Sequence, residues 1–180
     1  MMKKLDAIHA LRVFDKKGKF VFTKTDLSKL FPNDNPKAFN EGLSRLVKAR
    51  ILTRACRGVY VNELAQSKDG YMIEHIAKAL RRGDYSYVSL ESILSEYGII
   101  SQIPIDRLTV MTTGRKGTYK TPYGIIEFTH TKRALKGILL SIHRVKDRPL
   151  RIATKQAAIR DLKRVGRNIN LIQLDDDGND

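Results

Sequence analysis

Hydrophobic residues recur at helical spacing, or alternate as in strands, along most of the chain. In the helix predicted over residues 35–49 they recur at i, i+4, i+7 and i+8 and so form one apolar face: Phe39, Leu43, Leu46 and Val47. Similar spacing predicts helices over residues 3–15, 23–31, 71–82, 90–97 and 154–165. Alternating or apolar runs predict strands over residues 20–22, 51–54, 58–61, 85–89, 108–113, 119–121, 125–129, 135–145 and 150–153.

Capping residues mark the starts of several of these helices. Thr23 or Thr25 is the expected N-cap of the second helix, because its side-chain oxygen can accept a hydrogen bond from a free helical N–H. Asn35 and Thr154 are expected to cap the third helix and the last one. We expect Ser89 to cap the short helix that follows it, although the polar cluster around it could instead form a partner-binding surface.

The order of elements over residues 1–66 is typical of a winged helix-turn-helix domain. A Pro-Asn-Asp-Asn-Pro turn at residues 32–36 separates the second and third helices, and a short hairpin with Arg57 near its tip follows them. We therefore expect an α+β fold, with an N-terminal winged helix-turn-helix over 1–66 and a mixed α/β C-terminal domain over 67–174. Residues 175–180 are acidic and are expected to form a disordered tail.

The chain is strongly basic, with a formal net charge of +15 over 180 residues. Residues 1–65 carry 14 Lys and Arg against 6 Asp and Glu, and residues 66–174 carry 20 against 9, so both predicted domains are cationic. A charge of this size attracts polyanions and speeds their capture. Together with the helix-turn-helix pattern, it predicts double-stranded DNA as a partner.

The predicted third helix and the predicted wing supply the candidate DNA contacts. Asn40, Ser44 and Arg45 are candidates for reading bases near the exposed centre of the helix, since Asn pairs with adenine and Arg with guanine. The other candidates would mostly neutralise phosphates: Lys24, Lys37, Lys48, Arg54 and Arg57. The alternative is a solvated face that is merely basic. A second set of basic candidates, which would form another binding surface in the C-terminal domain, comprises Arg115, Lys116, Lys132, Arg133, Lys136 and Arg144.

Motifs for catalysis, metals or cofactors are weak. The four histidines are isolated, and Glu127 lacks the x-Lys that would complete a PD-(D/E)xK nuclease motif. A single cysteine, Cys56, excludes an internal disulfide and fits a reducing cytoplasm; we interpret it as a small wing residue rather than a redox sensor. No apolar run approaches the roughly 18 residues of a membrane span. We expect a cytoplasmic protein with no enzymatic activity, cofactor, metal or membrane association.

Three segments resemble the AbiEi-type antitoxins, transcriptional regulators of abortive-infection toxin–antitoxin systems. They read LTRACRGVYVN at residues 52–62, YVSLESILSEYGIISQIP at 87–104 and LTVMTTGRKGTYKTPYGIIEFTHT at 108–131. The resemblance implies a winged helix that binds inverted repeats in its own promoter and represses the operon. It also implies a C-terminal domain that counteracts a cognate nucleotidyltransferase-like toxin, in a type IV system that requires no stable complex. The last helix departs from the family, with AAIRDLKRVGR in place of a leucine-rich continuation.

Two other functions are open on the sequence alone. One is a stand-alone winged-helix repressor whose second domain senses a ligand or dimerises, and it predicts no toxic neighbouring gene. The other is an enzyme, such as a nuclease with an unrecognised site, and it predicts metal-dependent loss of a DNA substrate. The antitoxin and autorepressor hypothesis accounts for both the basic winged helix and the segments beyond it.

Overall fold

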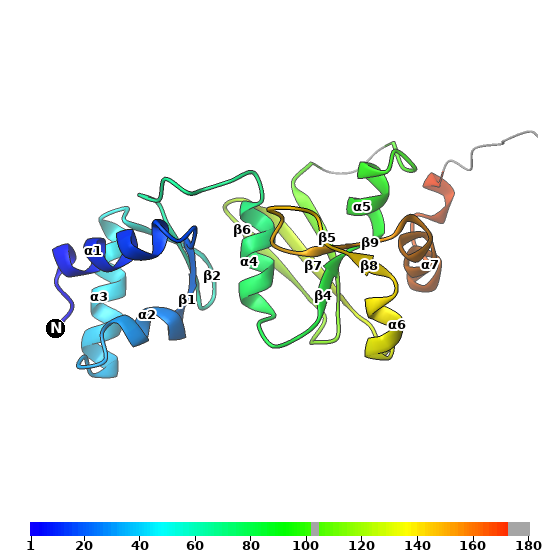
Figure 1. Cartoon of the computed structure of the whole chain (residues 1–180). Helices are drawn as coiled ribbons and strands as arrows, with labels where there is room; N and C mark the ends of the chain where they lie inside the picture. Colours follow the sequence, from blue (N-terminus) through cyan, green and yellow to red (C-terminus); the bar gives the residue numbers. More distant parts are fainter. Residues whose placement is uncertain (102–104, 173–180) are drawn as a thin grey trace, which may run out of the picture. The chain divides into compact units, whose positions relative to one another are not determined.

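The computed structural model describes residues 1–101 and 105–172 (Figure 1). Over these ranges the chain forms seven α-helices, one short 3-10 helix and two β-sheets. The prediction of a mixed α+β fold is confirmed at this level. The acidic segment 175–180, which was expected to be disordered, lies outside the described residues.

The chain divides into two compact units. The first comprises Met1–Leu80 together with Thr121–Tyr123, and the second comprises Arg81–Lys120 and the described residues from Gly124 onward. Within the first unit, the Tyr123 hydroxyl donates a hydrogen bond of 2.6 Å to the carboxylate of Glu63. The division therefore falls after residue 80, whereas the sequence predicted a domain boundary after residue 66.

The first unit contains four helices and a three-stranded antiparallel sheet in the order β1-β3-β2. Its elements are α1 (Lys4–Asp15), β1 (Val21–Thr23), α2 (Lys24–Leu30), α3 (Pro36–Lys48), β2 (Leu52–Cys56), β3 (Val59–Asn62) and α4 (Met72–Leu80). Apolar side chains from α1, α2, α3 and the sheet form one core, which includes Leu11, Phe22, Leu27, Phe39, Leu43, Leu46 and Leu52.

The caps of α2 and α3 form as the sequence predicts. Thr23 Oγ1 accepts a hydrogen bond of 3.1 Å from Asp26 N, and the Asp26 carboxylate accepts one of 3.0 Å from Thr23 N. This reciprocal pair satisfies two backbone donors that a helix start leaves free. Asn35 Oδ1 accepts a hydrogen bond of 2.9 Å from Ala38 N, and Pro36 occupies the first position of α3.

Helix α4 belongs to the first unit because it packs on β1 and β3. His75 of α4 lies edge-on to Phe20, with ring centroids 4.6 Å apart, so this histidine contributes to the packing of α4 in the first unit. The segment before α4 is held by Asp15, whose carboxylate accepts hydrogen bonds from the backbone N–H groups of Gln66 and Ser67. These contacts extend the first unit through the segment before α4.

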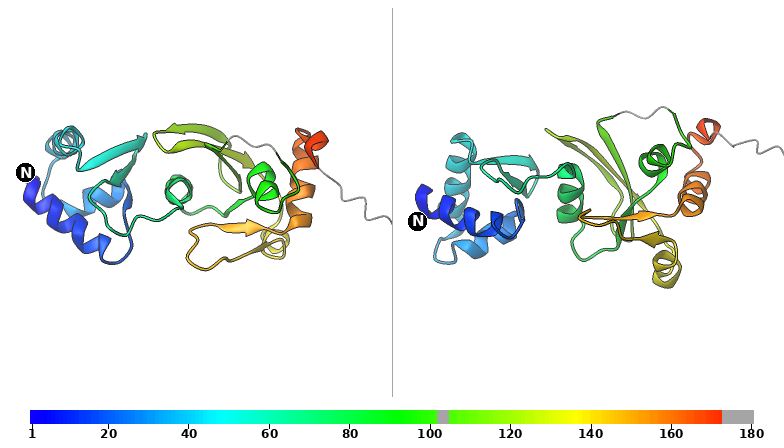
Figure 2. Two further views of the ribbon diagram at one scale, coloured as in Figure 1. Left: turned by 90° about the horizontal axis from the view of Figure 1, so that it is seen from above. Right: turned by 45° about the horizontal axis from the view of Figure 1, so that its top comes forward.

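The second unit is built on a six-stranded mixed sheet in the order β6-β7-β5-β4-β9-β8. Its elements are β4 (Ser86–Val88), α5 (Leu90–Glu96), β5 (Arg107–Thr112), β6 (Gly117–Thr121), β7 (Gly124–His130), α6 (Leu135–Leu139), β8 (Ile142–His143), β9 (Arg151–Ala153), α7 (Lys155–Val165) and a 3-10 turn (Ile169–Leu171). β5 pairs in parallel with β7, and β4 with β9. The left view of Figure 2 shows β6 and β7 at one edge of the sheet and β8 and β9 at the other.

The segment over residues 135–145 differs from its prediction. It forms the helix α6 and the two-residue strand β8 rather than one strand. Leu135 and Leu139 are one helical turn apart, and Ile138 is fully buried. A short apolar run is compatible with either a strand or a helix, so hydrophobic content alone does not decide between them.

The prediction that the Ser89 side chain caps α5 is also wrong. Ser89 Oγ donates instead to Asp161 Oδ2 at 2.9 Å, and because Ser89 is fully buried it is not part of a partner-binding surface either. Thr109 of β5 takes over the cap, since its Oγ1 accepts a hydrogen bond of 3.0 Å from Ser92 N and donates one of 2.7 Å to Ser89 O. The start of α5 is therefore fixed by a neighbouring strand.

Asp161 of α7 is a buried carboxylate, only 3% exposed. Besides Ser89, the hydroxyl of Tyr87 donates to it at 3.1 Å. Burial, and then the adjacent carboxylate, raise the pKa of Tyr87, so its phenol stays protonated and able to donate. An unpaired buried charge would cost several kcal/mol. Asp161 therefore joins α7 to β4 and to the start of α5.

Asp161→Ala is expected to lower the free energy of unfolding by about 3 kcal/mol, because two buried hydroxyl groups lose their acceptor. Urea denaturation followed by circular dichroism measures the change. The control is Asp106→Ala, which removes an exposed carboxylate and should change stability by less than about 0.5 kcal/mol. Equal losses in the two variants would contradict the role given to Asp161.

A charged cluster attaches the segment after α7 to α5 and β7. The Glu91 carboxylate accepts hydrogen bonds of 2.8 Å from Arg167 Nε and from Asn168 Nδ2. Glu127 is paired with Arg167 and, at 2.6 Å, with Arg107. Burial alone would raise the pKa of Glu91, but the hydrogen bonds from Arg167 and Asn168 outweigh it and lower that pKa.

The Glu91 cluster is expected to make stability depend on acid pH. The folded pKa lies below the ordinary value of 4.5, so the contribution of Glu91 is present above that pH and is lost as the pH falls through the folded pKa. Glu91→Gln should therefore be less stable than the wild type by about 1–2 kcal/mol at neutral pH, and the difference should shrink on acidification. Urea titrations from about pH 7 to about pH 3 measure it.

The exposed Glu41 provides the matched control for this pH series. Glu41→Gln removes one carboxylate from the chain without touching the Glu91 cluster. A stability difference between Glu91→Gln and the wild type that stayed constant down to the acid end of the series would contradict the prediction.

Candidate nucleic-acid interface

One side of α3 packs into the core, and its outer side is polar. Phe39, Leu43 and Leu46 are buried, and Gly42 leaves no spare room against Met2, whose Cβ would lie 3.2 Å from an added Cβ. The exposed residues on the opposite side of the helix are Lys37, Glu41, Ser44 and Lys48. Three of the predicted DNA contacts therefore share one exposed helix side.

Asn40 and Arg45 lie towards the two edges of that side. Successive residues are about 100° apart around a helix, so these two, five positions apart, are separated by about 140° with Ser44 between them. Arg45 Nη2 donates a hydrogen bond of 3.2 Å to the backbone oxygen of Met2. Neither residue is thus at the centre of the exposed side, where the sequence placed them; Arg45 lies at the edge beside the N-terminal segment.

The β2–β3 hairpin is tied to the start of α2. Lys24 N donates a hydrogen bond of 2.8 Å to Gly58 O. Gly58 has a φ of +79°, a conformation that side chains disfavour, and it allows the tight turn that presents Arg57. Both Arg57 and Arg54 are exposed. The Lys24–Gly58 hydrogen bond therefore brings Lys24 beside the predicted wing.

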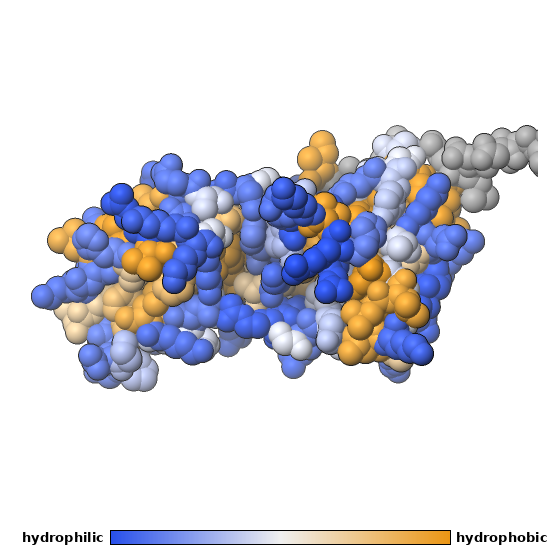
Figure 3. Space-filling view, in the orientation of Figure 1, coloured by the Kyte–Doolittle hydropathy of each residue, from blue (hydrophilic) through white to orange (hydrophobic). Residues whose placement is uncertain are grey.

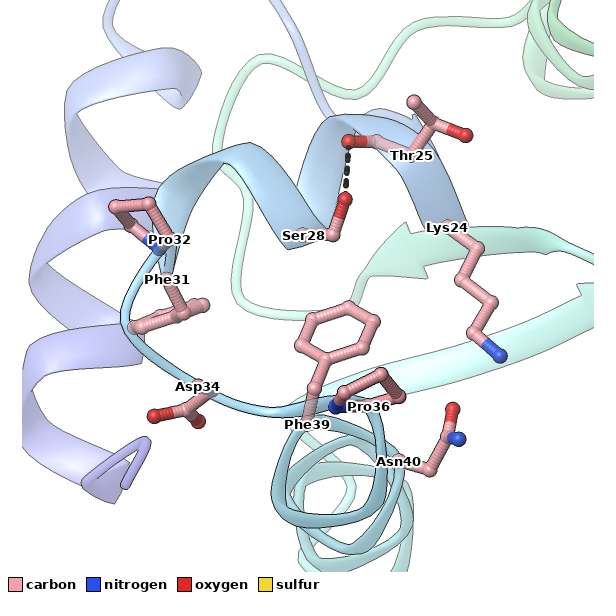
Figure 4. A pocket seen from close by; sticks show the side chains of 9 residues that line it. All are labelled: Lys24, Thr25, Ser28, Phe31, Pro32, Asp34, Pro36, Phe39 and Asn40. Atoms are coloured by element: carbon pink, nitrogen blue, oxygen red, sulfur yellow. Dashed lines mark hydrogen bonds between the residues drawn. The ribbon is translucent and has the colours of Figure 1, made fainter.

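A groove of about 460 Å³ lies between α2 and α3. Figure 4 shows the rings of Phe31 and Phe39 in this groove, with the Lys24 side chain extending toward Asn40 at one side. The groove is lined by Lys24, Thr25, Ser28, Phe31, Pro32, Asp34, Pro36, Phe39 and Asn40. Lys24 and Asn40 therefore lie on one continuous surface with the start of α3.

The acidic residues near this surface are mostly engaged elsewhere. Asp26 completes the α2 cap and pairs with Lys19 at 3.3 Å. Asp34 accepts a hydrogen bond of 2.8 Å from Met2 N. On the exposed side of α3, Glu41 is the acid that stands among the lysines. Lysines and arginines therefore outnumber the acids at this surface, which suits a phosphate backbone.

Cys56 at the end of β2 is a half-buried free thiol. Burial raises its pKa, and the nearby Arg54 only partly opposes that effect. The thiol therefore stays protonated near neutral pH, which disfavours nucleophilic or redox chemistry. This agrees with the interpretation of Cys56 as a small structural residue.

The second set of basic candidates is spread over several elements of the second unit. β5 and β7 run in parallel, so the turn at residues 115–116 and the segment that contains Lys132 follow the same end of the sheet. Arg133 precedes α6 and Lys136 lies in it. Arg144 follows β8, which is three strands from β5, or about 14 Å at the usual strand spacing. Arg144 is therefore separated from the 115–116 turn by the width of three strands.

Arg81 supports the basic turn, although nothing in the sequence marks it. It is buried, and its Nε donates a hydrogen bond of 2.9 Å to Arg115 O. Its guanidinium lies 4.1 Å from the ring centroid of Phe128 and 5.1 Å from that of Tyr119, within the range of cation–π attraction. These rings come from β7 and β6, so only the folded sheet reveals this role.

Within residues 1–101 and 105–172, no group of three or more His, Cys, Asp or Glu could hold a metal ion. Glu127, the acid considered for a nuclease, is occupied by Arg107 and Arg167. In the same described part of the chain, no helix has the length and apolar character needed to cross a membrane.

No family model matches this chain, and no curated protein matches it. Two arrangements in the first unit bear on its function. One is the polar outer side of α3, and the other is the arginine-bearing hairpin attached to α2. Together they form a cationic surface that can contact a helical polyanion.

Proposed function

We propose that the first unit is a winged helix-turn-helix DNA-binding domain. Helices α2 and α3 with the turn between them form the helix-turn-helix, α3 enters the major groove, and the β2–β3 hairpin is the wing. The observation that carries this proposal is the polar outer side of α3 together with the hydrogen bond from Lys24 N to Gly58 O. That bond sets the wing beside α2, so one duplex can meet all three elements.

The positions of the side chains suggest different roles on DNA. Asn40 and Ser44 are exposed on α3 and are proposed to reach base edges. The lysines of α2 and α3 and the wing arginines are proposed to contact phosphates: Lys24, Lys37, Lys48, Arg54 and Arg57. For Arg45, whose guanidinium is hydrogen-bonded to Met2 O, we propose a phosphate contact at the edge of α3 rather than base reading.

For the whole chain we propose a cytoplasmic antitoxin and autorepressor of an AbiE-like type IV system in phage defence. The first unit would bind inverted repeats in its own promoter, and the second would counteract a nucleotidyltransferase-like toxin from the neighbouring gene. Support comes from the segments that resemble AbiEi antitoxins, residues 87–101 and 108–131. They supply β4, α5 and most of the β5–β7 strands, which are the centre of the second unit.

We propose no enzymatic role for the second unit. Its buried or half-buried acids are each committed to structural partners. Asp161 is bonded to Tyr87 and Ser89, and Glu91 is bonded to Arg167. None of these carboxylates is arranged as a free acid–base pair.

Lys48→Gln is expected to weaken binding to every duplex, whatever its sequence, because it removes a phosphate contact. The magnitude of the slope of log affinity against log salt concentration should fall by about 0.9. Fluorescence anisotropy with a labelled promoter duplex and an unrelated duplex measures both effects. Asn40→Ala should instead cost about 1–3 kcal/mol on the promoter duplex and less on the unrelated one.

Lys17→Gln is the matched control for these measurements. Lys17 is an exposed lysine that precedes the start of β1, at the opposite end of the sheet from the wing turn. Its loss should leave the salt slope unchanged. Equal slopes for Lys48→Gln and the wild type would remove α3 from the DNA contact, and uniform losses for Asn40→Ala would refute base reading by that residue.

The neighbouring gene, induced alone, is expected to stop growth, and coexpression of this chain is expected to restore it. Growth curves and colony counts measure both. A full-length Lys48→Gln, Arg57→Gln variant, weakened in DNA binding, should still restore growth, because neutralisation is assigned to the second unit. A harmless neighbouring gene would contradict the antitoxin proposal and leave a stand-alone repressor.

A further inference from the structure

Helix α6 exposes three leucines to solvent. Leu135 is 42% exposed, Leu139 is 43% exposed, and Leu140, directly after the helix, is 78% exposed. Figure 3 shows hydrophobic residues gathered over α6 on the surface of the second unit. Exposed apolar side chains are common singly, but a cluster on one short element is a mark of an interaction site.

The helix that carries these leucines is fixed to the rest of the second unit. Ile138 of α6 is fully buried and fixes the helix against the second unit. Ser141 Oγ donates a hydrogen bond of 2.7 Å to Gly137 O and in turn accepts one of 3.4 Å from Arg160 of α7. The helix is therefore held at both its middle and its end while its leucines face outward.

The charged residues next to the leucines in sequence are all basic. Residues 131–146 contain five Lys and Arg and no Asp or Glu. Lys132 and Lys136 are exposed, and the helical turn places Lys136 between Leu139 and Leu140 around the helix. We use the name α6 patch for Leu135, Leu139 and Leu140 with Lys132 and Lys136.

We propose that the α6 patch docks directly onto the toxin encoded by the neighbouring gene, in an apolar pocket edged by carboxylates. This inference rests on the proposed antitoxin function and goes beyond it, because the resemblance to type IV antitoxins requires no direct contact. The leucines supply the apolar anchors that dominate protein interfaces, and the lysines select an acidic rim.

The charge of the patch favours this occupant over two others. A second copy of the chain would bring the same lysines face to face, and like charges across an interface oppose docking. An anionic membrane would match the charge, but helices that lie in membrane interfaces present long apolar faces, whereas α6 has five residues. An acidic protein surface satisfies both the leucines and the lysines.

Leu140→Glu tests the proposal with little risk to folding, because that side chain is the most exposed of the three. With the purified toxin, isothermal titration calorimetry should show a Kd raised about tenfold or more. Rescue of growth from the toxin should fall in parallel, whereas promoter binding and the melting temperature should stay unchanged. Lys136→Glu, which reverses the charge in the patch, should weaken binding and rescue in the same direction.

Two matched controls separate the patch from general effects of added charge. Leu5→Glu places a carboxylate on an exposed leucine of α1, and Lys155→Glu reverses an exposed lysine at the start of α7. Both should bind the toxin and restore growth like the wild type. Equal loss in the controls and the α6 variants would overturn the proposal.

The remaining outcomes are distinct. If the toxin is toxic and both α6 variants restore growth and bind it like the wild type, docking through α6 is overturned while the antitoxin function stands. If the neighbouring gene is harmless, the proposed function fails and this docking fails with it. Binding of the wild type to phosphatidylglycerol vesicles that Leu140→Glu abolishes would assign the patch to membranes. A dimer that Leu140→Glu dissolves in analytical ultracentrifugation would assign it to self-association.

Discussion

The arrangement of the second unit depends on one buried carboxylate. Asp161 is 3% exposed, and a charge so removed from water must be hydrogen-bonded or it costs several kcal/mol. Tyr87 and Ser89 meet that need, and because both come from the β4 segment, the requirement fixes α7 against the sheet. It also takes the Ser89 hydroxyl away from the start of α5, which Thr109 then caps from β5. One electrostatic constraint thus sets the contacts of two helices and two strands.

Local interactions are the part of this fold that could be predicted from the sequence. Thr23, Asn35 and Thr154 cap their helices through contacts three residues along the chain, and such contacts are visible in a short window. Ser89 has the same local pattern, but its hydroxyl is drawn to a carboxylate on α7. The prediction of a strand over residues 135–145 is wrong for a related reason. Its short apolar pattern does not show that packing buries Ile138 and leaves its neighbours outside.

The candidate interface also has one part that the sequence predicts and one part that only the structure shows. The exposed side of α3 follows from the helical spacing of its apolar residues, so Lys37, Ser44 and Lys48 were predicted without the structure. The Lys24–Gly58 and Arg45–Met2 hydrogen bonds join residues far apart in sequence, and no spacing rule indicates them. The first of these sets the hairpin beside α2, and the second ties the Arg45 guanidinium to the N-terminal segment. The composition of the surface was predictable, whereas its geometry was not.

Other contacts than those of the exposed leucines hold α6 in the second unit. Ile138 and the Ser141–Gly137 hydrogen bond already hold the helix, and both are satisfied within the second unit. A leucine that is 78% exposed, as Leu140 is, gains little of the burial that stabilises apolar side chains. Polar residues at the three leucine positions would keep the anchor and reduce the tendency to aggregate. The exposed part of these side chains, most of all that of Leu140, gains burial only when another molecule covers it, and the neighbouring lysines favour an acidic one.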